Sequence, residues 1–311
     1  MQVAHRVWRG GRARPRNPPG AATIHTMRWF TLPQRRFRRW LSVTLLCGAG
    51  FSQVLAASPP TGPAASVDLA DLTTTELQAR QQAGVDTVLV PIGGTEQSGP
   101  HMALGKHNVR VHFLADEIAR TWGRAVVAPV LAYVPEGTVT PPQGHMRFTG
   151  TISIPTPVFE GLLESTARSF HQHGFRHVVF LGDHGGYQHS LETVANRLNK
   201  EWKGGADGSA VVALTGYYRA AEDFDGMLKA QGFSEAEIGL HAGLADTALM
   251  MAVDPSLVRV DRLRTAGVDH GADGVRGQPA RATSALGQPG IRHIIDTSVA
   301  ALRAQLPTPS H

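Results

Sequence analysis

The stretch VDTVLVPIGGTEQSGPHMALGKHN, residues 85–108, joins an apolar run to a loop crowded with titratable side chains. The apolar half predicts a buried β-strand, because it is short, rich in β-branched residues and followed by two glycines. The second half holds Glu96, Ser98, His101 and His107. Loop residues of this chemistry raise the question of whether the loop holds a metal ion, a phosphate or a nucleophile.

Segments typical of helices and strands alternate along the rest of the chain. Further strands are expected at 125–130, 178–181 and 210–214, and helices at 73–84, 111–122, 159–170 and 191–202. This alternation predicts an α/β fold with a mostly parallel sheet covered on both faces. Ligands of such sheets bind beyond the carboxyl ends of the strands. Both the loop at 94–108 and the turn DHGGY at 183–187 are expected at that edge.

The N-terminal residues 1–57 differ in composition from the rest of the chain. An Arg- and Pro-rich extension, residues 1–26, precedes a basic segment and an apolar run at 40–55, which predicts a signal peptide. The run is short for a bilayer-spanning helix, although a permanent N-terminal anchor is the alternative. Residues 58–67 then predict a flexible leader, and residues 68–306 one catalytic domain. The protein is therefore expected to be exported to the periplasm or beyond, with membrane contact only through the signal.

The positive charge of the chain belongs to this signal. The full sequence has 30 basic and 25 acidic residues, but residues 1–57 contain ten arginines and no Asp or Glu. The remaining chain is therefore acidic overall, which argues against a nucleic-acid partner. The single cysteine, Cys47, also lies in the signal, so no disulfide is expected after cleavage.

Three clusters carry candidate metal-site chemistry. The loop at 94–108 is the first, Asp183 and His184 form the second, and HAGLADT with His241 and Asp246 forms the third. Imidazole and carboxylate together are usual ligands of zinc and related divalent ions. A serine-hydrolase role for Ser98 is disfavoured, because TEQSG lacks the G-x-S-x-G pattern.

The order of PIGGTEQSGPH, FTGTISIP, GFRHVVFLGDHGG, HAGLADT and GVRGQPARAT resembles the creatininase (creatinine amidohydrolase) family over nearly all of residues 68–300. The resemblance implies a three-layer α/β/α fold, often assembled as a hexamer. It also implies a divalent metal centre, frequently with two ions, that activates water to hydrolyse an amide C–N bond.

The residue-by-residue match is incomplete. Glu96 and His184 match metal-binding residues of the family, and His241 matches the histidine that assists proton transfer. Ser98 stands where a histidine ligand is usual, His107 where a bridging aspartate is usual, and Asp246 where a glutamate is usual. One metal site is therefore expected, built from Glu96, His107, His184 and Asp246, with zinc the first choice and manganese or iron as alternatives. The altered ligands argue against a second ion.

Other readings of these residues stay open. Glu96 could cap a helix or form a salt bridge, and His107 could be a hydrogen-bonded polar histidine. His101 and Asp183 are expected to orient neighbours, and His145 to face the pocket or bond the backbone. Lys106 is expected in solvent, although it could hold an anionic substrate.

The sequence therefore predicts an exported, metal-dependent amidohydrolase of small or cyclic amides, with Glu96 and His241 catalytic. The alternative is a periplasmic protein of the same fold that binds a metal or small molecule without turnover. A homo-oligomer is expected in either case.

Overall fold

The computed structural model describes residues 66–203, 208–268 and 271–306. The predicted signal, Cys47 and nearly all of the 58–67 leader lie outside these residues. Within them, no helix combines the length and the hydropathy that crossing a membrane would require.

Four parallel strands form the sheet in the described part of the chain, in the order β2–β1–β3–β4. They are β1 (Thr87–Ile92), β2 (Ala125–Val127), β3 (His177–Gly182) and β4 (Ala210–Ala213). Every residue of β1, β2 and β3 is buried, as expected when helices cover both faces of a parallel sheet. Ile92 pairs with Gly182, so β1 and β3 end at the same level.

Helices form a layer on each face of this sheet. The major ones are α1 (Thr74–Gln82), α2 (Lys106–Trp122), α3 (Thr156–Gln172), α4 (Gln188–Trp202), α5 (Thr215–Ala230), α6 (Glu235–Ile238), α7 (Leu244–Val253) and α8 (Ser284–Gln305). Short 3-10 helices are η1 (Leu69–Asp71), η2 (Gly144–Arg147), η3 (Gly185–Tyr187), η4 (Pro255–Leu257), η5 (Val260–Arg262) and η6 (Pro279–Arg281).

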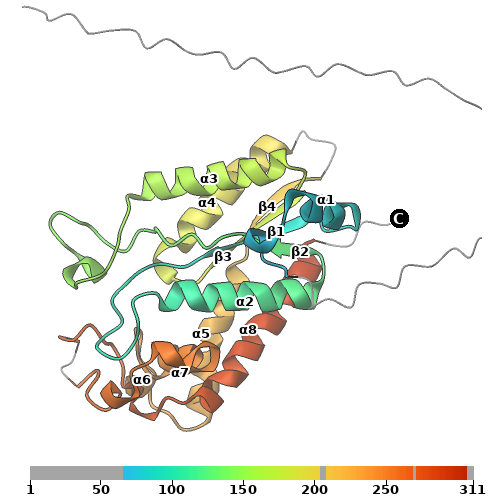
Figure 1. Ribbon diagram of the computed structural model, residues 1–311. Helices are drawn as coiled ribbons and strands as arrows, with labels where there is room; N and C mark the ends of the chain where they lie inside the picture. Colours follow the sequence, from blue (N-terminus) through green and yellow to red (C-terminus); the bar gives the residue numbers. More distant parts are fainter. Residues whose placement is uncertain (1–65, 204–207, 269–270, 307–311) are drawn as a thin grey trace, which may run out of the picture. The chain divides into compact units, whose positions relative to one another are not determined.

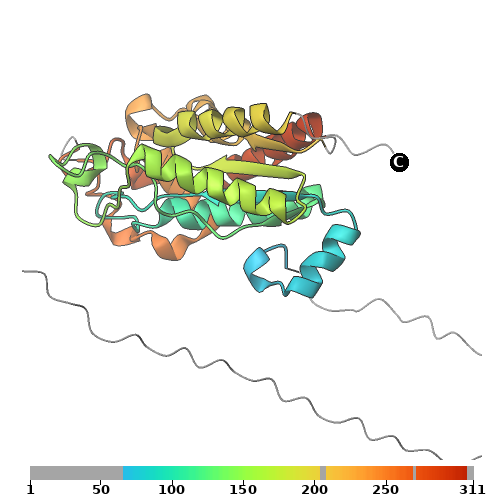
Figure 2. The same cartoon turned by 90° about the horizontal axis from the view of Figure 1, so that it is seen from above.

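Side-chain alternation along β1 separates the two cores. Val88 and Val90 pack with α3 and α4, whereas Leu89 packs with α2, α5, α7 and α8. Figure 1 shows the two helix layers on opposite sides of the strands, and in Figure 2 α3 and α4 run side by side. The predicted three-layer α/β/α fold is confirmed.

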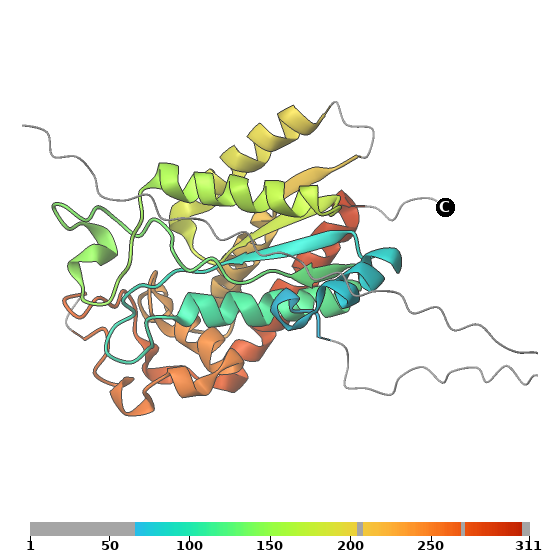
Figure 3. The same cartoon turned by 45° about the horizontal axis from the view of Figure 1, so that its top comes forward.

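The loops that follow the strands gather at one end of the sheet (Figure 3). The loop after β1 carries Glu96, and the turn after β3 carries Asp183 and His184. The long connection between β2 and α3 and the segment after α7 lie at the same end. This end therefore brings together the loops in which the sequence places its titratable clusters.

Candidate active site and metal centre

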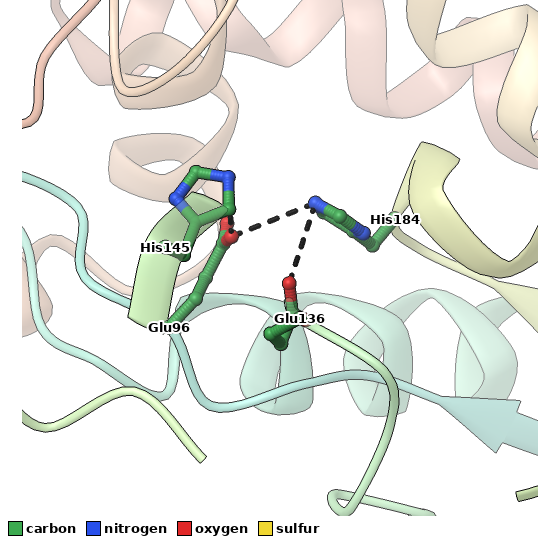
Figure 4. A group of neighbouring side chains, drawn as sticks. All are labelled: Glu96, Glu136, His145 and His184. Atoms are coloured by element: carbon green, nitrogen blue, oxygen red, sulfur yellow. Dashed lines mark ion pairs between the residues drawn. The ribbon is translucent and has the colours of Figure 1, made fainter. Parts of the chain in front are cut away.

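Four side chains from three loops meet at this end of the sheet: Glu96, Glu136, His145 and His184 (Figure 4). Their ligand atoms all lie within 4.8 Å of one another, which suits one shared cation. Glu96 and His184 meet because they follow neighbouring strands that end in register. Glu136 and His145 come from the connection between β2 and α3, where His145 lies in η2.

The carboxylate of Glu96 is fully buried and has a different environment at each oxygen. Its Oε1 lies 2.7 Å from Nε2 of His107 and 3.5 Å from Nζ of Lys106. Its Oε2 faces His145 at 3.3 Å and His184 at 3.5 Å, with no hydrogen-bond partner. Burial raises the pKa of Glu96, but the charge of Lys106 and the contact with His107 lower it by more than burial raises it. The group is therefore ionised.

Glu136 is a buried acid that the sequence analysis did not identify. Both of its carboxylate oxygens are buried without a hydrogen-bond partner, and Oε2 lies 3.7 Å from Nε2 of His184. Burial and then the charge of Glu96 raise its pKa to about 8. Two neighbouring carboxylates that lack donors form an arrangement that a bound cation would relieve.

The two imidazoles of the cluster are neutral at physiological pH, the state in which histidine binds metals. Burial lowers the pKa of His184 to about 4 and also lowers that of His145. The backbone N–H of Gly186 donates to Nδ1 of His184 at 3.1 Å, so Nε2 faces the carboxylates. With this contact the proton of the neutral ring is on Nε2, so a cation could bind Nε2 of the neutral ring only if the proton moved to Nδ1 and the contact with Gly186 opened.

His107 and Asp246, both expected as metal ligands, lie beside this cluster rather than in it. His107 bridges Glu96 and Asp183, since its Nδ1 lies 2.6 Å from Oδ2 of Asp183. Asp246 accepts hydrogen bonds from Lys106 at 3.0 Å, Arg110 at 2.9 Å and the backbone of Ala242. The acceptor atoms of Asp246 are thus taken by fixed cations, and both residues belong to a buried ion-pair network.

Asp183 is the centre of this network. Its carboxylate accepts from Arg110, from His107 and from the hydroxyl of Tyr217 at 2.6 Å. Burial raises its pKa, but the charge of Arg110 lowers it more, so Asp183 is ionised. The expectation that it orients neighbours agrees with this placement.

Lys106 is fully buried, and the expectation of a solvated lysine is wrong. The side chain enters the site because it stands at the first residue of α2, directly beside His107. Its ammonium group lies between Glu96 and Asp246.

His241 lies within reach of the same oxygen of Glu96, with Nδ1 at 3.6 Å from Oε1. Its Nε2 lies 2.9 Å from the carbonyl oxygen of Gln97, to which it donates. Burial and then the charge of Lys106 lower its pKa to about 3, so the ring is neutral. A neutral imidazole with Nε2–H engaged has its free lone pair on Nδ1, facing Glu96.

Gln97 orients this part of the site through its side-chain amide. Its Nε2 donates to the carbonyl of Gly274 at 3.0 Å and lies 3.1 Å from Nδ1 of His145. Its Oε1 accepts from the backbone of Gly99. No sequence pattern predicts this role, because an isolated glutamine has no characteristic spacing.

The remaining expected residues lie close to the cluster. Ser98 is buried, and its hydroxyl has no hydrogen-bond partner among the described residues. His101 places Nε2 3.0 Å from the hydroxyl of Thr247. Tyr187, the last residue of the turn DHGGY, accepts from the backbone of Asp183 and His184. Its hydroxyl lies 2.7 Å from the carbonyl of Ile92, which ties the ends of β1 and β3 together.

A cavity of about 310 Å³ opens over these residues. The residues that line it include Lys106, His145, His184, His241, Tyr218 and Arg276. The volume suits a small molecule or one end of a longer one.

Comparison with known proteins identifies the family. A family model described as creatinine amidohydrolase matches residues 70–302, and the chain belongs to this creatininase family. A creatinine amidohydrolase of Pseudomonas putida is 30% identical over 210 residues, covering 66% of this chain and 77% of that protein. A mycofactocin precursor peptide peptidase of Mycolicibacterium smegmatis is 29% identical over 225 residues, covering 66% and 79%.

Solved structures give the same result. A crystal structure of creatinine amidohydrolase superposes with a TM-score of 0.67 at 25% identity, covering 78% of this chain and 99% of that chain. A manganese form of creatininase has a TM-score of 0.66 at 26% identity, covering 78% and 100%. The chain is thus a creatininase-family hydrolase of C–N bonds, and its Glu/His cluster could hold a divalent metal.

Proposed function

We propose that this chain is a metal-dependent amidohydrolase that cleaves the C–N bond of a small or cyclic amide. The observation that carries the proposal is the set of three buried carboxylate oxygens, from Glu96 and Glu136, that have no hydrogen-bond partner beside two neutral imidazoles. Family membership supports the reaction type. The cavity of about 310 Å³ favours a small substrate.

The donor set fits a divalent ion such as zinc or manganese. Two carboxylates and two imidazoles are ligands that zinc accepts, and the carboxylates would neutralise its charge. Glu96, Glu136, His145 and His184 would hold it. A divalent ion bound there would polarise the substrate carbonyl and lower the pKa of a water molecule.

The residues around the cluster would position the reactants and move a proton. Lys106 and His107 keep Glu96 ionised and fixed from the side of Oε1. His241 is neutral, with Nδ1 available, so it can accept a proton from the attacking water and pass it to the departing nitrogen. Asp183 holds His107 in place through Nδ1, and Arg110 donates a hydrogen bond to Asp246.

Hydrolysis and metal binding are tested together on the purified full chain. We expect about one zinc or manganese ion per chain by elemental analysis, and release of ammonia or amine from a panel of small cyclic and linear amides. His184→Ala should lose both. His189→Ala, which changes an exposed histidine nearby, should lose neither.

Two results would favour other functions. Short peptides cleaved in preference to small amides would place this chain closer in activity to the mycofactocin precursor peptide peptidases, to which it is also similar. Metal binding without release of any product would favour the non-catalytic binding protein.

We also propose that the chain is exported and acts as a homo-oligomer. The basic and apolar composition of residues 1–57 supports export. Cell fractionation and light scattering test these two points, and a cytoplasmic monomer would contradict both.

A further inference from the structure

Lys106 occupies a position that is costly for a cation. Its side chain is buried, with the cavity as the only open space beside it among the described residues, and it stands at the first residue of α2, where the helix dipole is positive. Two carboxylates compensate: Asp246 at 3.0 Å and Glu96 at 3.5 Å. Because burying a cation is costly, the placement of Lys106 indicates that its positive charge has a role in the cavity.

The ammonium group acts on the whole site. Its charge lowers the pKa of His101, His145, His184 and His241, in addition to that of Glu96. It contacts Glu96 at Oε1, whereas His145 and His184 face the other oxygen. Lys106 therefore contacts one member of the cluster, Glu96, at the oxygen that faces away from the two histidines.

The geometry leaves Lys106 a free donor. An ammonium group has three N–H donors. One donates to Asp246, a second is within ion-pair distance of Glu96 at 3.5 Å, and the described residues provide no partner for the third. Lys106 also lines the cavity, together with His241.

We propose that Lys106 is a catalytic residue whose third N–H donates a hydrogen bond to the carbonyl oxygen of the substrate amide. The proposal rests on the proposed amidohydrolase function. As the oxygen of water bonds to the carbonyl carbon, negative charge develops on the carbonyl oxygen, and the fixed ammonium group stabilises it. Lys106 keeps its three protons throughout. The C–N bond then breaks, and the departing nitrogen receives the proton that His241 took from the water.

Lys106→Met tests this role, because methionine keeps much of the length of the side chain and removes the charge. We expect kcat to fall roughly 100- to 1000-fold, the loss typical of removing one oxyanion-stabilising donor. Zinc content should stay at the parent value, because the four ligands remain and His107 still contacts Oε1 of Glu96. Lys200→Met, an exposed lysine of α4, is the matched control and should change neither quantity.

A purely structural role would give a different result for zinc content. If Lys106 only held Glu96 in place, Lys106→Met would lose zinc together with activity, and this outcome would overturn the proposal. A variant with the parent kcat would overturn it as well. If the parent chain hydrolyses no amide, the proposed function fails and the catalytic role of Lys106 fails with it, whatever the variants do.

The double variant Lys106→Met with Asp246→Asn serves where the single variant does not fold. It removes one positive and one negative charge, so the net charge of the buried network is unchanged. The same loss of kcat with zinc retained would support the proposal, and activity at the parent level would overturn it.

Discussion

Asp183→Asn should be among the most destabilising single substitutions in this fold, although it changes only one atom. The aspartate is buried, and it accepts from Arg110, His107 and Tyr217. Asparagine fills the same volume but has one acceptor oxygen and no charge. Arg110 would keep only Asp246 as an ionised partner.

The expected loss follows from the burial of the pair. Removing one partner of a buried ion pair costs about 3–5 kcal/mol, because the remaining charge stays out of water. With a urea m-value of about 3 kcal/mol per molar for a domain of this size, the midpoint should shift by roughly 1 M or more. Urea unfolding followed by circular dichroism measures the shift, with m-values compared to confirm the same unfolding transition.

Glu201→Gln is the matched control, because it makes the same chemical change in an ion pair at the surface. Glu201 contacts Arg168 at 2.6 Å, and both side chains are exposed. Exposed pairs contribute little, so its midpoint should stay at the parent value. An Asp183→Asn midpoint as close to the parent as that of Glu201→Gln would refute the view that this network stabilises the fold.

Three further predictions concern the site. In metal-free protein, the pKa of Glu136 is about 8 against an ordinary 4.5, so the folded state holds an extra proton between these values. Its contribution to stability should fall as pH rises from 4.5 to 8. In the presence of chelator, the urea midpoint of the parent should therefore fall more between pH 5 and pH 8 than that of Glu136→Gln, and parallel profiles would contradict this. Gly274→Ala should cost about 1–2 kcal/mol for its positive φ and also lower kcat, since the new Cβ would lie 2.0 Å from Oε1 of Gln97. Gly123→Ala, at a similar φ with open space, should cost stability without affecting kcat. Zinc at 100 times its Kd should stabilise the parent by about 2.7 kcal/mol in thermal unfolding and leave His184→Ala unchanged, whereas equal stabilisation would place the ion elsewhere.

The fold was predictable from the sequence because its signals are local. The apolar run at 85–94 contains β1 (Thr87–Ile92), and the expected strand at 178–181 lies within β3 (His177–Gly182). Strand ends were less certain: the run at 125–130 continues past β2, which ends at Val127. Pro129 follows closely, and proline has no N–H to donate to the neighbouring β1.

The site was predictable only where the residues follow strands directly. Glu96 and His184 come within a few residues of β1 and β3, so the parallel sheet brings them together. Glu136 and His145 come from a long connection without periodicity. The sequence allowed His145 to face the pocket, but only the tertiary structure places both residues beside Glu96. Lys106 shows the converse difficulty. A lysine in a polar loop is normally solvated, and its burial depends on Asp246, which lies 140 positions further along the chain.

The division of Glu96 between two environments constrains how this chain can evolve. One oxygen belongs to the buried ion-pair network and the other to the candidate metal cluster. A carboxylate in place of His107 would meet Asp183 and Glu96 as a third negative charge, and a neutral residue in place of Lys106 would leave Asp246 short of a cation. Single exchanges at these positions are therefore expected to cost stability, and a change of metal stoichiometry at this site is expected to need paired substitutions. Lys106 and His107 should accordingly be inherited together.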